Sequence, residues 1–274
     1  MTGTLILCAT PIGNLGDAPP RLGEALRTAD VVYAEDTRRS SALAKHLGAN
    51  PTMRSFFAGN EEQRSTEIRE RLESGETVAL LTDAGTPALS DPGFLAVKSA
   101  IEAGATVTVV PGPSAVTAAL AVAGLPAERF TFEGFLPRRG SARRKRLAAV
   151  APRTETTVLF ASPSRIGRDL ADIAAIDPDR NVVVARELTK MYEEVWRGSA
   201  AEAAAHWAEG GRGEFTVVIA GHPEEAADLE ASAARVLDLV AGGEAFAEAV
   251  REIAETDGVP RRGLYEEALR RRDV

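Results

Sequence analysis

The feature that most constrains the fold is an alternation between short apolar runs and longer amphipathic stretches. In the first half, five runs rich in β-branched residues are separated by segments with helical periodicity. This alternation is typical of a mainly parallel sheet covered by helices, and a run such as Val78-Ala79-Leu80-Leu81 indicates burial of both strand faces. The expected strands are Leu5–Thr10, Val31–Glu35, Met53–Phe57, Val78–Thr82 and Val107–Val110, and the expected helices are 20–28, 38–47, 61–73 and 92–103.

A second set of strands follows Pro126. In this set, strand 192–197 is followed by strand 215–220, which suggests some antiparallel pairing. We therefore expect a smaller mixed α/β domain. The last segment lacks a strand pattern, and its Asp257-Gly258-Val259-Pro260 separates two helices in a helix-turn-helix-like arrangement. The predicted domains are 1–112, 113–223 and 224–274; the remaining expected strands are 130–135, 157–161 and 182–187, with helices at 141–149, 164–175 and 199–209.

Composition excludes several classes of protein. Of 274 residues, 45% are hydrophobic, which is enough for a packed core, yet no apolar run reaches the roughly 18 residues of a membrane helix. The segment Met1–Leu5 lacks the basic region of a signal peptide, so a cytoplasmic location is expected. The single Cys8 cannot form an internal disulfide, which agrees with a reducing compartment.

The charge distribution matters more than the net charge of −8. Residues 224–257 hold ten acidic and two basic side chains, whereas 137–146 hold six cations and no anion. Phosphate binding depends on such local basic patches, although charged runs are also common on solvated faces and arginines can cap a helix C-terminus. The predicted RNA contacts are Arg138, Arg139, Arg143, Arg144, Lys145, Arg146, Arg261 and Arg262.

Four loops that follow predicted strands carry the small and polar residues of a ligand site. Two of them are 10–17, with Gly13, and the long 82–93 segment, with Gly85. A third, 34–39, contains two carboxylates and two guanidinium groups, and a fourth places Ser114 before a helix N-terminus. Ligands of parallel sheets bind at the carboxyl ends of strands, so these loops predict a cleft but do not identify its ligand.

Six motifs in order carry a family resemblance. They are Thr10-Pro11-Ile12-Gly13-Asn14-Leu15, Ala34-Glu35-Asp36-Thr37-Arg38, Asp83-Ala84-Gly85-Thr86-Pro87 with Ser90-Asp91-Pro92-Gly93, Pro111-Gly112-Pro113-Ser114-Ala115, Glu133-Gly134-Phe135-Leu136-Pro137 and Arg186-Glu187-Leu188-Thr189-Lys190. Over essentially the whole chain, the sequence resembles the bacterial 16S ribosomal RNA cytidine 2′-O-ribose methyltransferase family of the tetrapyrrole-methylase superfamily.

The resemblance implies two α/β domains of the class III methyltransferase type with a cofactor cleft between them, followed by a C-terminal helical segment. It also implies a homodimer, S-adenosyl-L-methionine as cofactor, and small-subunit ribosomal RNA or the 30S subunit as substrate, with a cytidine ribose in the decoding region as target. The implied cofactor contacts are Pro11, Ile12, Gly13, Asn14, Asp83, Ala84, Gly85, Thr86, Pro87, Ser114, Ala115, Leu188 and Ala220.

The sequence departs from the family pattern in two places. Gly59-Asn60-Glu61 stands where the family often has His-Asn-Glu, and Ala161-Ser162-Pro163-Ser164-Arg165 stands where it often has Glu-Ser-Pro-His-Arg. These departures remove two candidate bases for a ribose hydroxyl. The remaining candidates are Glu35, Asp36, Asp83, Glu187 and Lys190. We predict Lys190, which would need a lowered pKa to act as a base, whereas a structural salt bridge is the alternative for this residue.

No metal is expected, because His46, His206 and His222 lack ligand spacing with each other or with Cys8. Two other functions remain open. One is a methylase of a tetrapyrrole or another small molecule, which would not need the basic cluster at 138–146. The other is a helix-turn-helix nucleic-acid-binding protein with a non-catalytic α/β module. The intact ligand loops argue against it.

Overall fold

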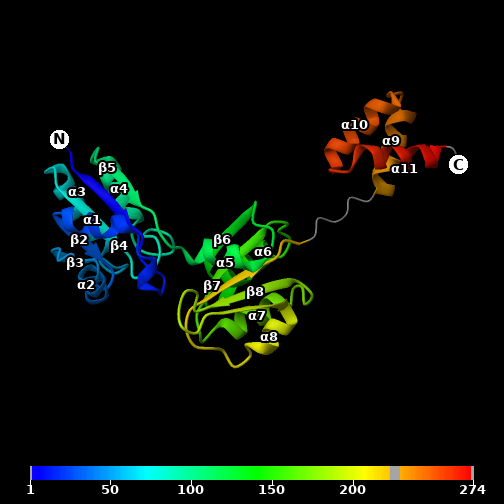
Figure 1. The fold of residues 1–274 in the computed structure, drawn as a ribbon. Helices are drawn as coiled ribbons and strands as arrows, with labels where there is room; N and C mark the ends of the chain where they lie inside the picture. The colour runs from blue at the N-terminus through cyan, green and yellow to red at the C-terminus, as the bar shows by residue number, and fades with distance from the viewer. Residues whose placement is uncertain (1, 223–228, 273–274) are drawn as a thin grey trace. The chain divides into compact units, whose positions relative to one another are not determined.

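The computed structural model describes residues 2–222 and 229–272, and the chain divides into two compact units, Met1–Ala220 and Gly221–Val274. The first unit contains two five-stranded sheets, and the described part of the second is helical (Figure 1). The predicted α/β class is confirmed. The predicted domain boundary at 112/113 stays a prediction, and the one at 223/224 lies outside the described residues, as do three of the ten acidic side chains of 224–257.

The first sheet is formed by strands that alternate with helices along the chain. Its elements are β1 (Thr4–Cys8), a 3₁₀ turn (Leu15–Asp17), α1 (Pro20–Thr28), β2 (Val31–Ala34), α2 (Thr37–His46), β3 (Met53–Ser55), α3 (Glu61–Glu73), β4 (Thr77–Leu81), α4 (Phe94–Glu102) and β5 (Thr106–Val110). All strands are parallel in the order β3-β2-β4-β1-β5. The carboxyl ends of the strands, and the loops that follow them, therefore share one edge.

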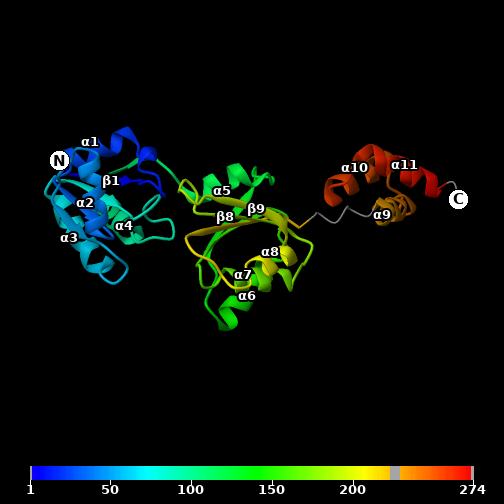
Figure 2. The same cartoon turned by 60° about the horizontal axis from the view of Figure 1, so that its bottom comes forward.

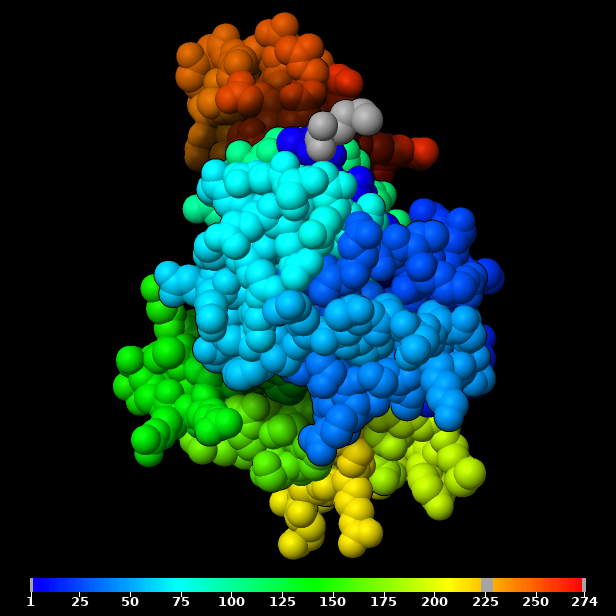
Figure 3. Space-filling model, turned by 90° about the vertical axis from the view of Figure 1, so that its left-hand side faces the viewer, coloured from blue at the N-terminus to red at the C-terminus, as the bar shows by residue number. Residues whose placement is uncertain are grey.

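Helices cover both faces of this sheet. Helices α1 and α2 pack against Cys8 and Val32 on one face, and α3 and α4 pack against Leu5 and Tyr33 on the other. Figure 3 shows the outer surface of this part of the chain, in blue to cyan. This double cover explains why β2 is buried at every position and why its sequence is apolar throughout.

The second sheet is mixed, with the strand order β6-β7-β10-β8-β9. Its elements are α5 (Ala115–Ala123), β6 (Phe130–Phe135), α6 (Gly140–Val150), β7 (Thr156–Ala161), α7 (Ile166–Ala174), β8 (Asn181–Arg186), β9 (Glu194–Ser199), α8 (Ala200–His206) and β10 (Phe215–Ile219). Strand β10 is antiparallel to β7 and β8, and β9 is antiparallel to β8. The mixed sheet was predicted, but β9 and β10 are not neighbours, because β9 pairs with the strand that immediately precedes it.

Helices α6, α7 and α8 cover one face of the second sheet, and α5 covers the other (Figure 2). On the α5 side, Leu120 packs in a cluster with Val158 and Val183. The same cluster contains Ile12, which comes from the loop after β1, and Leu188, which follows β8. The core of the second sheet therefore includes a residue from the strand-end loops of the first.

The C-terminal unit consists, in its described residues, of α9 (Leu229–Ala241), α10 (Phe246–Asp257) and α11 (Arg261–Arg272). These helices enclose a core that includes Val236, Val250 and Leu264. Helix α10 is followed by the capping residue Gly258 with φ +67°, as the sequence predicted, and α11 begins just after Pro260. Among the described residues, no helix has the length and apolar character needed to cross a membrane.

Candidate functional site

Three strand-end loops of the first sheet converge at Gly85. The Thr10 N–H donates to the Gly85 carbonyl at 2.8 Å, and the Gly85 N–H donates to the Thr10 carbonyl at 3.2 Å. Gly85 has φ +82°, and a Cβ there would lie 3.8 Å from Ile12 Cγ2 and 3.9 Å from the Pro113 carbonyl oxygen. The loops after β1, β4 and β5, which carry most of the predicted cofactor contacts, are therefore brought together.

A fourth loop is joined to this group through Asp83. The Asp36 N–H donates to Asp83 Oδ1 at 2.9 Å, and Arg39 Nη1 lies 3.5 Å from Asp83 Oδ2. Asp36 itself caps α2 by accepting from the Arg38 N–H, and this bond lowers the pKa of Asp36. Both carboxylates thus have protein partners, and Asp83 ties the loop after β4 to the loop after β2.

The loop after β5 ends at the N-terminus of α5. Helix α5 begins at Ala115, and the side chain of the capping residue Ser114 makes no hydrogen bond to the helix. The N–H groups of a first helical turn have no intrahelical acceptor, so they can bind an anionic group such as a carboxylate. Ser114 and Ala115 are therefore placed to offer backbone donors.

Three further motifs lie where strands β6, β7 and β8 of the second sheet end, at one edge of that sheet. Strands β6, β7 and β8 run in the same direction, and Phe215 pairs with both Ala161 and Arg186, the last residues of β7 and β8. A Cβ on Gly13 would lie 2.4 Å from Lys190 Cγ and 3.0 Å from Thr189 Oγ1. This close approach places the segment after β8 directly against the loop after β1.

Backbone strain is concentrated in two of these loops. Within the described residues, the non-glycine residues with positive φ are Ala88 and Ser90 after β4, and Glu187 and Thr189 after β8. Thr189 Oγ1 is also buried without a hydrogen-bond partner. Strained backbone clusters at functional sites, and a buried hydroxyl without a partner fits a polar ligand that is bound there.

Lys190 does not have the surroundings of a base. Its Nζ lies 2.8 Å from Glu187 Oε1 and 3.1 Å from Glu214 Oε2. Partial burial by itself would lower the pKa of Lys190, but the bonds to the two carboxylates outweigh it and raise the pKa. The sequence-based choice of Lys190 as catalytic base therefore lacks the lowered pKa that it requires, and the alternative of a structural salt bridge is what the geometry shows.

Asp91, in the loop after β4, is a carboxylate that was not among the bases predicted from the sequence. Thr82 Oγ1 is 2.8 Å from Asp91 Oδ2 and 3.3 Å from Glu35 Oε2. Burial raises the pKa of Asp91, the hydroxyl of Thr82 lowers it, and the charges of Glu35 and Asp83 raise it further. Asp91 stands in the strained loop after β4, and its type and position in that loop were the available sequence signal.

These surroundings predict the behaviour of a Lys190→Arg variant. Arginine keeps the ion pairs but cannot act as a base, so we expect kcat to remain within about fivefold of wild type, whereas loss of a base costs about 10²–10⁴-fold. The kcat of wild type should fall as acidic pH protonates a carboxylate of raised pKa, and it should not rise with lysine deprotonation in alkali. A decrease in kcat of about 10²-fold in Lys190→Arg, with unchanged cofactor affinity, would show that Lys190 is the base.

The predicted RNA contacts separate into paired and unpaired cations. The Arg143 side chain is 4% exposed, and its guanidinium lies 2.8 Å from Asp169 and 2.6 Å from Asp172. Its assignment to an RNA surface is therefore wrong, because it is a buried partner of two carboxylates. Arg146 pairs with Glu133. Arg138, Arg139, Arg144 and Lys145 have no carboxylate partner among the described residues.

The arginines of α11 are largely engaged within their own unit. Arg262 pairs with Glu266 at 3.0 Å, while Arg270 and Arg271 both pair with Glu267. Arg261 has no ion pair among the described side chains and remains exposed. Helix α11 thus has fewer arginines without an ion pair than its sequence alone indicates.

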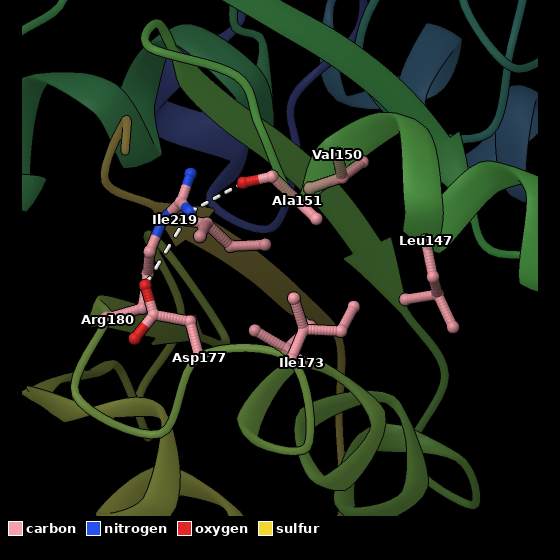
Figure 4. A pocket seen from close by; sticks show the side chains of 8 residues that line it. Leu147, Val150, Ala151, Ile173, Asp177, Arg180 and Ile219 are labelled. Atoms are coloured by element: carbon pink, nitrogen blue, oxygen red, sulfur yellow. Dashed lines mark hydrogen bonds and ion pairs between the residues drawn. The ribbon is translucent and has the colours of Figure 1, made fainter. Parts of the chain in front are cut away.

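Ala220 lies at the wrong edge of the second sheet for the predicted cofactor contact. Residue Ile219 pairs with Val182, near the start of β8, whereas Leu188 follows the end of that strand. The Ala220 carbonyl accepts from Arg180 Nε at 2.8 Å, next to an apolar cavity of about 20 Å³ lined by Ile173 and Ile219 (Figure 4). Such a cavity has room for about one water molecule, so it is not a cofactor site.

Two further questions from the sequence concern metal binding and the reactivity of Cys8. Within residues 2–222 and 229–272, no three His, Cys, Asp or Glu side chains gather as metal ligands would. Cys8 is buried in the first sheet, and burial raises its pKa to about 12. Its thiol is therefore a core group rather than a nucleophile.

Comparison with known proteins identifies the family. The tetrapyrrole (corrin/porphyrin) methylases match residues 4–204. Ribosomal RNA small subunit methyltransferase I of Mycobacterium tuberculosis (strain CDC 1551 / Oshkosh) is 48% identical, covering 99% of this chain and 96% of that protein. The protein of the same name from Xylella fastidiosa (strain Temecula1) is 43% identical, covering 96% of this chain and 98% of the relative.

A solved structure supports the fold. Uroporphyrin-III C-methyl transferase from Thermus thermophilus, complexed with S-adenyl homocysteine, is 19% identical with a TM-score of 0.56, covering 79% of this chain and 96% of that chain. The strand-end loops that meet at Gly85 therefore belong to a methylase fold. The chain is a methyltransferase of the tetrapyrrole methylase family, and within that family it belongs with the ribosomal RNA small subunit methyltransferase I proteins.

Proposed function

We propose that the protein transfers a methyl group from S-adenosyl-L-methionine to the 2′-hydroxyl of a cytidine ribose in the decoding region of 16S ribosomal RNA. The observation that carries this proposal is the convergence of three strand-end loops at Gly85, beside the strained segment Glu187–Lys190. The name of the full-length relatives supports small-subunit RNA as substrate. The structural relative complexed with S-adenyl homocysteine supports the cofactor.

The residues that meet at this site fit the proposed cofactor. S-adenosylmethionine carries a methyl group on a sulfonium, together with a carboxylate, a ribose and a base. The free N–H groups after Ser114 would bind the carboxylate, and Ile12 and Leu188 would form an apolar wall. The absence of a side chain at Gly85 leaves room between the loops. The proposed contacts are Pro11–Asn14, Asp83–Pro87, Ser114, Ala115 and Leu188; Ala220 is not among them.

Methyl transfer needs positioning more than chemical activation, because the sulfonium is a good leaving group. The ribose hydroxyl must also lose a proton, and a nearby carboxylate is the proposed acceptor. Among the carboxylates of the strand-end loops, Asp91 has the raised pKa that favours this role, with Glu35 bonded to the same Thr82 hydroxyl. We further propose that the enzyme is a homodimer that acts on ribosomal RNA or the 30S subunit in the cytoplasm.

The four unpaired cations of the 138–145 segment predict a salt-dependent affinity for RNA. Replacing Arg138, Arg139, Arg144 and Lys145 by glutamine should weaken RNA binding and reduce the salt slope of log K by roughly 0.7 for each phosphate group that is no longer neutralised. Binding of S-adenosylmethionine should not change. Filter binding between about 50 and 200 mM salt measures the slope. An unchanged slope would remove this cluster from the RNA surface.

A methyl-transfer assay tests the proposed function against its alternatives. With labelled S-adenosylmethionine, we expect label in 16S RNA or 30S subunits and none in a tetrapyrrole. Label in the tetrapyrrole and none in RNA would contradict the RNA substrate. Failure to bind S-adenosylmethionine by calorimetry would contradict the proposed cofactor.

A further inference from the structure

Strand β6 contains a bulge just before its last residue, Phe135. The strand pairs in register with β7 as far as Phe132, and the register then shifts before Phe135, which pairs with Phe160. Gly134 within the bulge has φ +62°, a conformation that glycine adopts without strain. Bulges commonly re-aim a side chain beside a functional site.

The ring of Phe135 contacts a second aromatic ring and still remains half exposed. Its centroid is 5.6 Å from that of Phe160, which in turn lies 4.9 Å from Phe132. Phe135 nevertheless remains 51% exposed. Its contact with Phe160 supports the ring, and its exposed part is available for stacking.

The acidic side chain of the bulge is neutralised, and the segment that follows the bulge is basic. The side chain of Glu133 is 3% exposed and pairs with Arg146 and Arg153, so its charge is neutralised. Arg138 and Arg139 follow Phe135 closely in sequence and have no carboxylate partner among the described residues. The exposed ring is thus adjacent along the chain to free cations.

The same bulge contacts the strained loop of the candidate site. A Cβ on Gly134 would lie 3.1 Å from Ser90 Oγ, next to Asp91. A nucleotide bound at Phe135 would therefore lie beside the loop that carries Asp83–Pro87 and Asp91. Exposed aromatic rings beside basic side chains are the usual means by which proteins bind single-stranded RNA.

We propose that Phe135 is a stacking platform for a base of a single-stranded RNA segment that includes or adjoins the methylated nucleotide, with Arg138 and Arg139 binding its phosphates. This inference rests on the proposed RNA substrate and adds the element that recognises the unpaired base. It predicts that the enzyme binds a single-stranded RNA, whose bases are unpaired, more tightly than it binds a duplex of the same sequence.

Substitution of Phe135 tests the platform. Stacking supports each base strongly enough that Phe135→Ala should weaken RNA binding about tenfold or more, and raise KM for RNA with it. Phe135→Leu should behave like Phe135→Ala, whereas Phe135→Tyr should restore most of the affinity. Calorimetric affinity for S-adenosylmethionine should be unchanged in all three, which separates RNA binding from damage to the cofactor site.

Phe130→Ala is the matched control, because Phe130 is 43% exposed at the opposite end of the same strand. It should leave RNA affinity unchanged. Equal effects of the two alanine variants, wild-type affinity in Phe135→Ala, or a change in oligomeric state confined to the Phe135 variants would overturn the platform. Absence of RNA methylation by the wild-type enzyme would instead overturn the proposed function, and the platform with it.

Discussion

Replacement of Gly85 by valine is expected to lower kcat/KM for methyl transfer about 10²-fold or more. Gly85 has φ +82°, and both its N–H and its carbonyl bond to Thr10. A β-branched residue resists this conformation at a cost of about 1–3 kcal/mol, and its methyl groups would enter the space between Ile12 and Pro113. A displacement of about 1 Å in a site that works by positioning is enough for a 10²-fold decrease in rate.

Gly48→Val provides the matched control for this prediction. Gly48 also has a left-handed conformation, φ +67°, but nothing lies within 4 Å of a Cβ built there. Both variants should decrease in thermal stability by similar amounts, whereas only Gly85→Val should bind S-adenosylmethionine more weakly in calorimetry. Equal affinities in the two variants would show that the cofactor is bound elsewhere.

Replacement of Arg143 by methionine is expected to lower the free energy of unfolding by about 3–5 kcal/mol, because removal of one partner leaves a buried charge uncompensated. Arg143 contacts Asp169, which is 3% exposed, as well as Asp172. Its guanidinium also donates to the Pro137 carbonyl at 3.1 Å. Urea unfolding monitored by circular dichroism measures the change as a shift of the midpoint.

Arg144→Met is the control, since Arg144 is the exposed neighbour of Arg143. Its unfolding free energy should change by no more than about 0.5 kcal/mol, while its RNA affinity should fall. Arg143→Met, assayed below its unfolding transition, should bind RNA as wild type does. A stable Arg143→Met variant with weakened RNA binding would return Arg143 to the RNA surface.

The charge run at 138–146 shows what a sequence pattern leaves undetermined. Charge alone cannot tell which side chains of α6 face inward. Arg143 stands at positions i, i+4 and i+7 with Leu147 and Val150, so helical periodicity places it on the apolar face. That periodicity was available in the sequence, but the partners Asp169 and Asp172 lie on another helix and were not.

The fold was largely predictable because its pattern is local. The central strands β2 and β4 are apolar and buried at almost every position, and the ends of all five strands could be placed to within one or two residues. Strand pairing in the second sheet was harder to predict, because β10 inserts between β7 and β8 from a distant part of the chain. That insertion also placed Ala220 at the edge opposite Leu188.

Several features of the site depend on contacts that no single segment reveals. Glu187 and Thr189 have positive φ, the Thr189 hydroxyl lacks a partner, and this segment packs against Gly13, which is far away in the sequence. The raised pKa of Asp91 likewise requires its burial near Glu35. Motifs located the loops, whereas the chemistry of individual side chains followed from their packing.

The most direct test is to map ribose methylation in small-subunit RNA after reaction with the purified protein and S-adenosylmethionine. We predict a new 2′-O-methyl group at a single cytidine of the decoding region, formed by the wild-type and Gly48→Val proteins and formed at least about 10²-fold more slowly by Gly85→Val. A methyl group on a base, methylation at a site outside that region, or undiminished methylation by Gly85→Val would contradict the account.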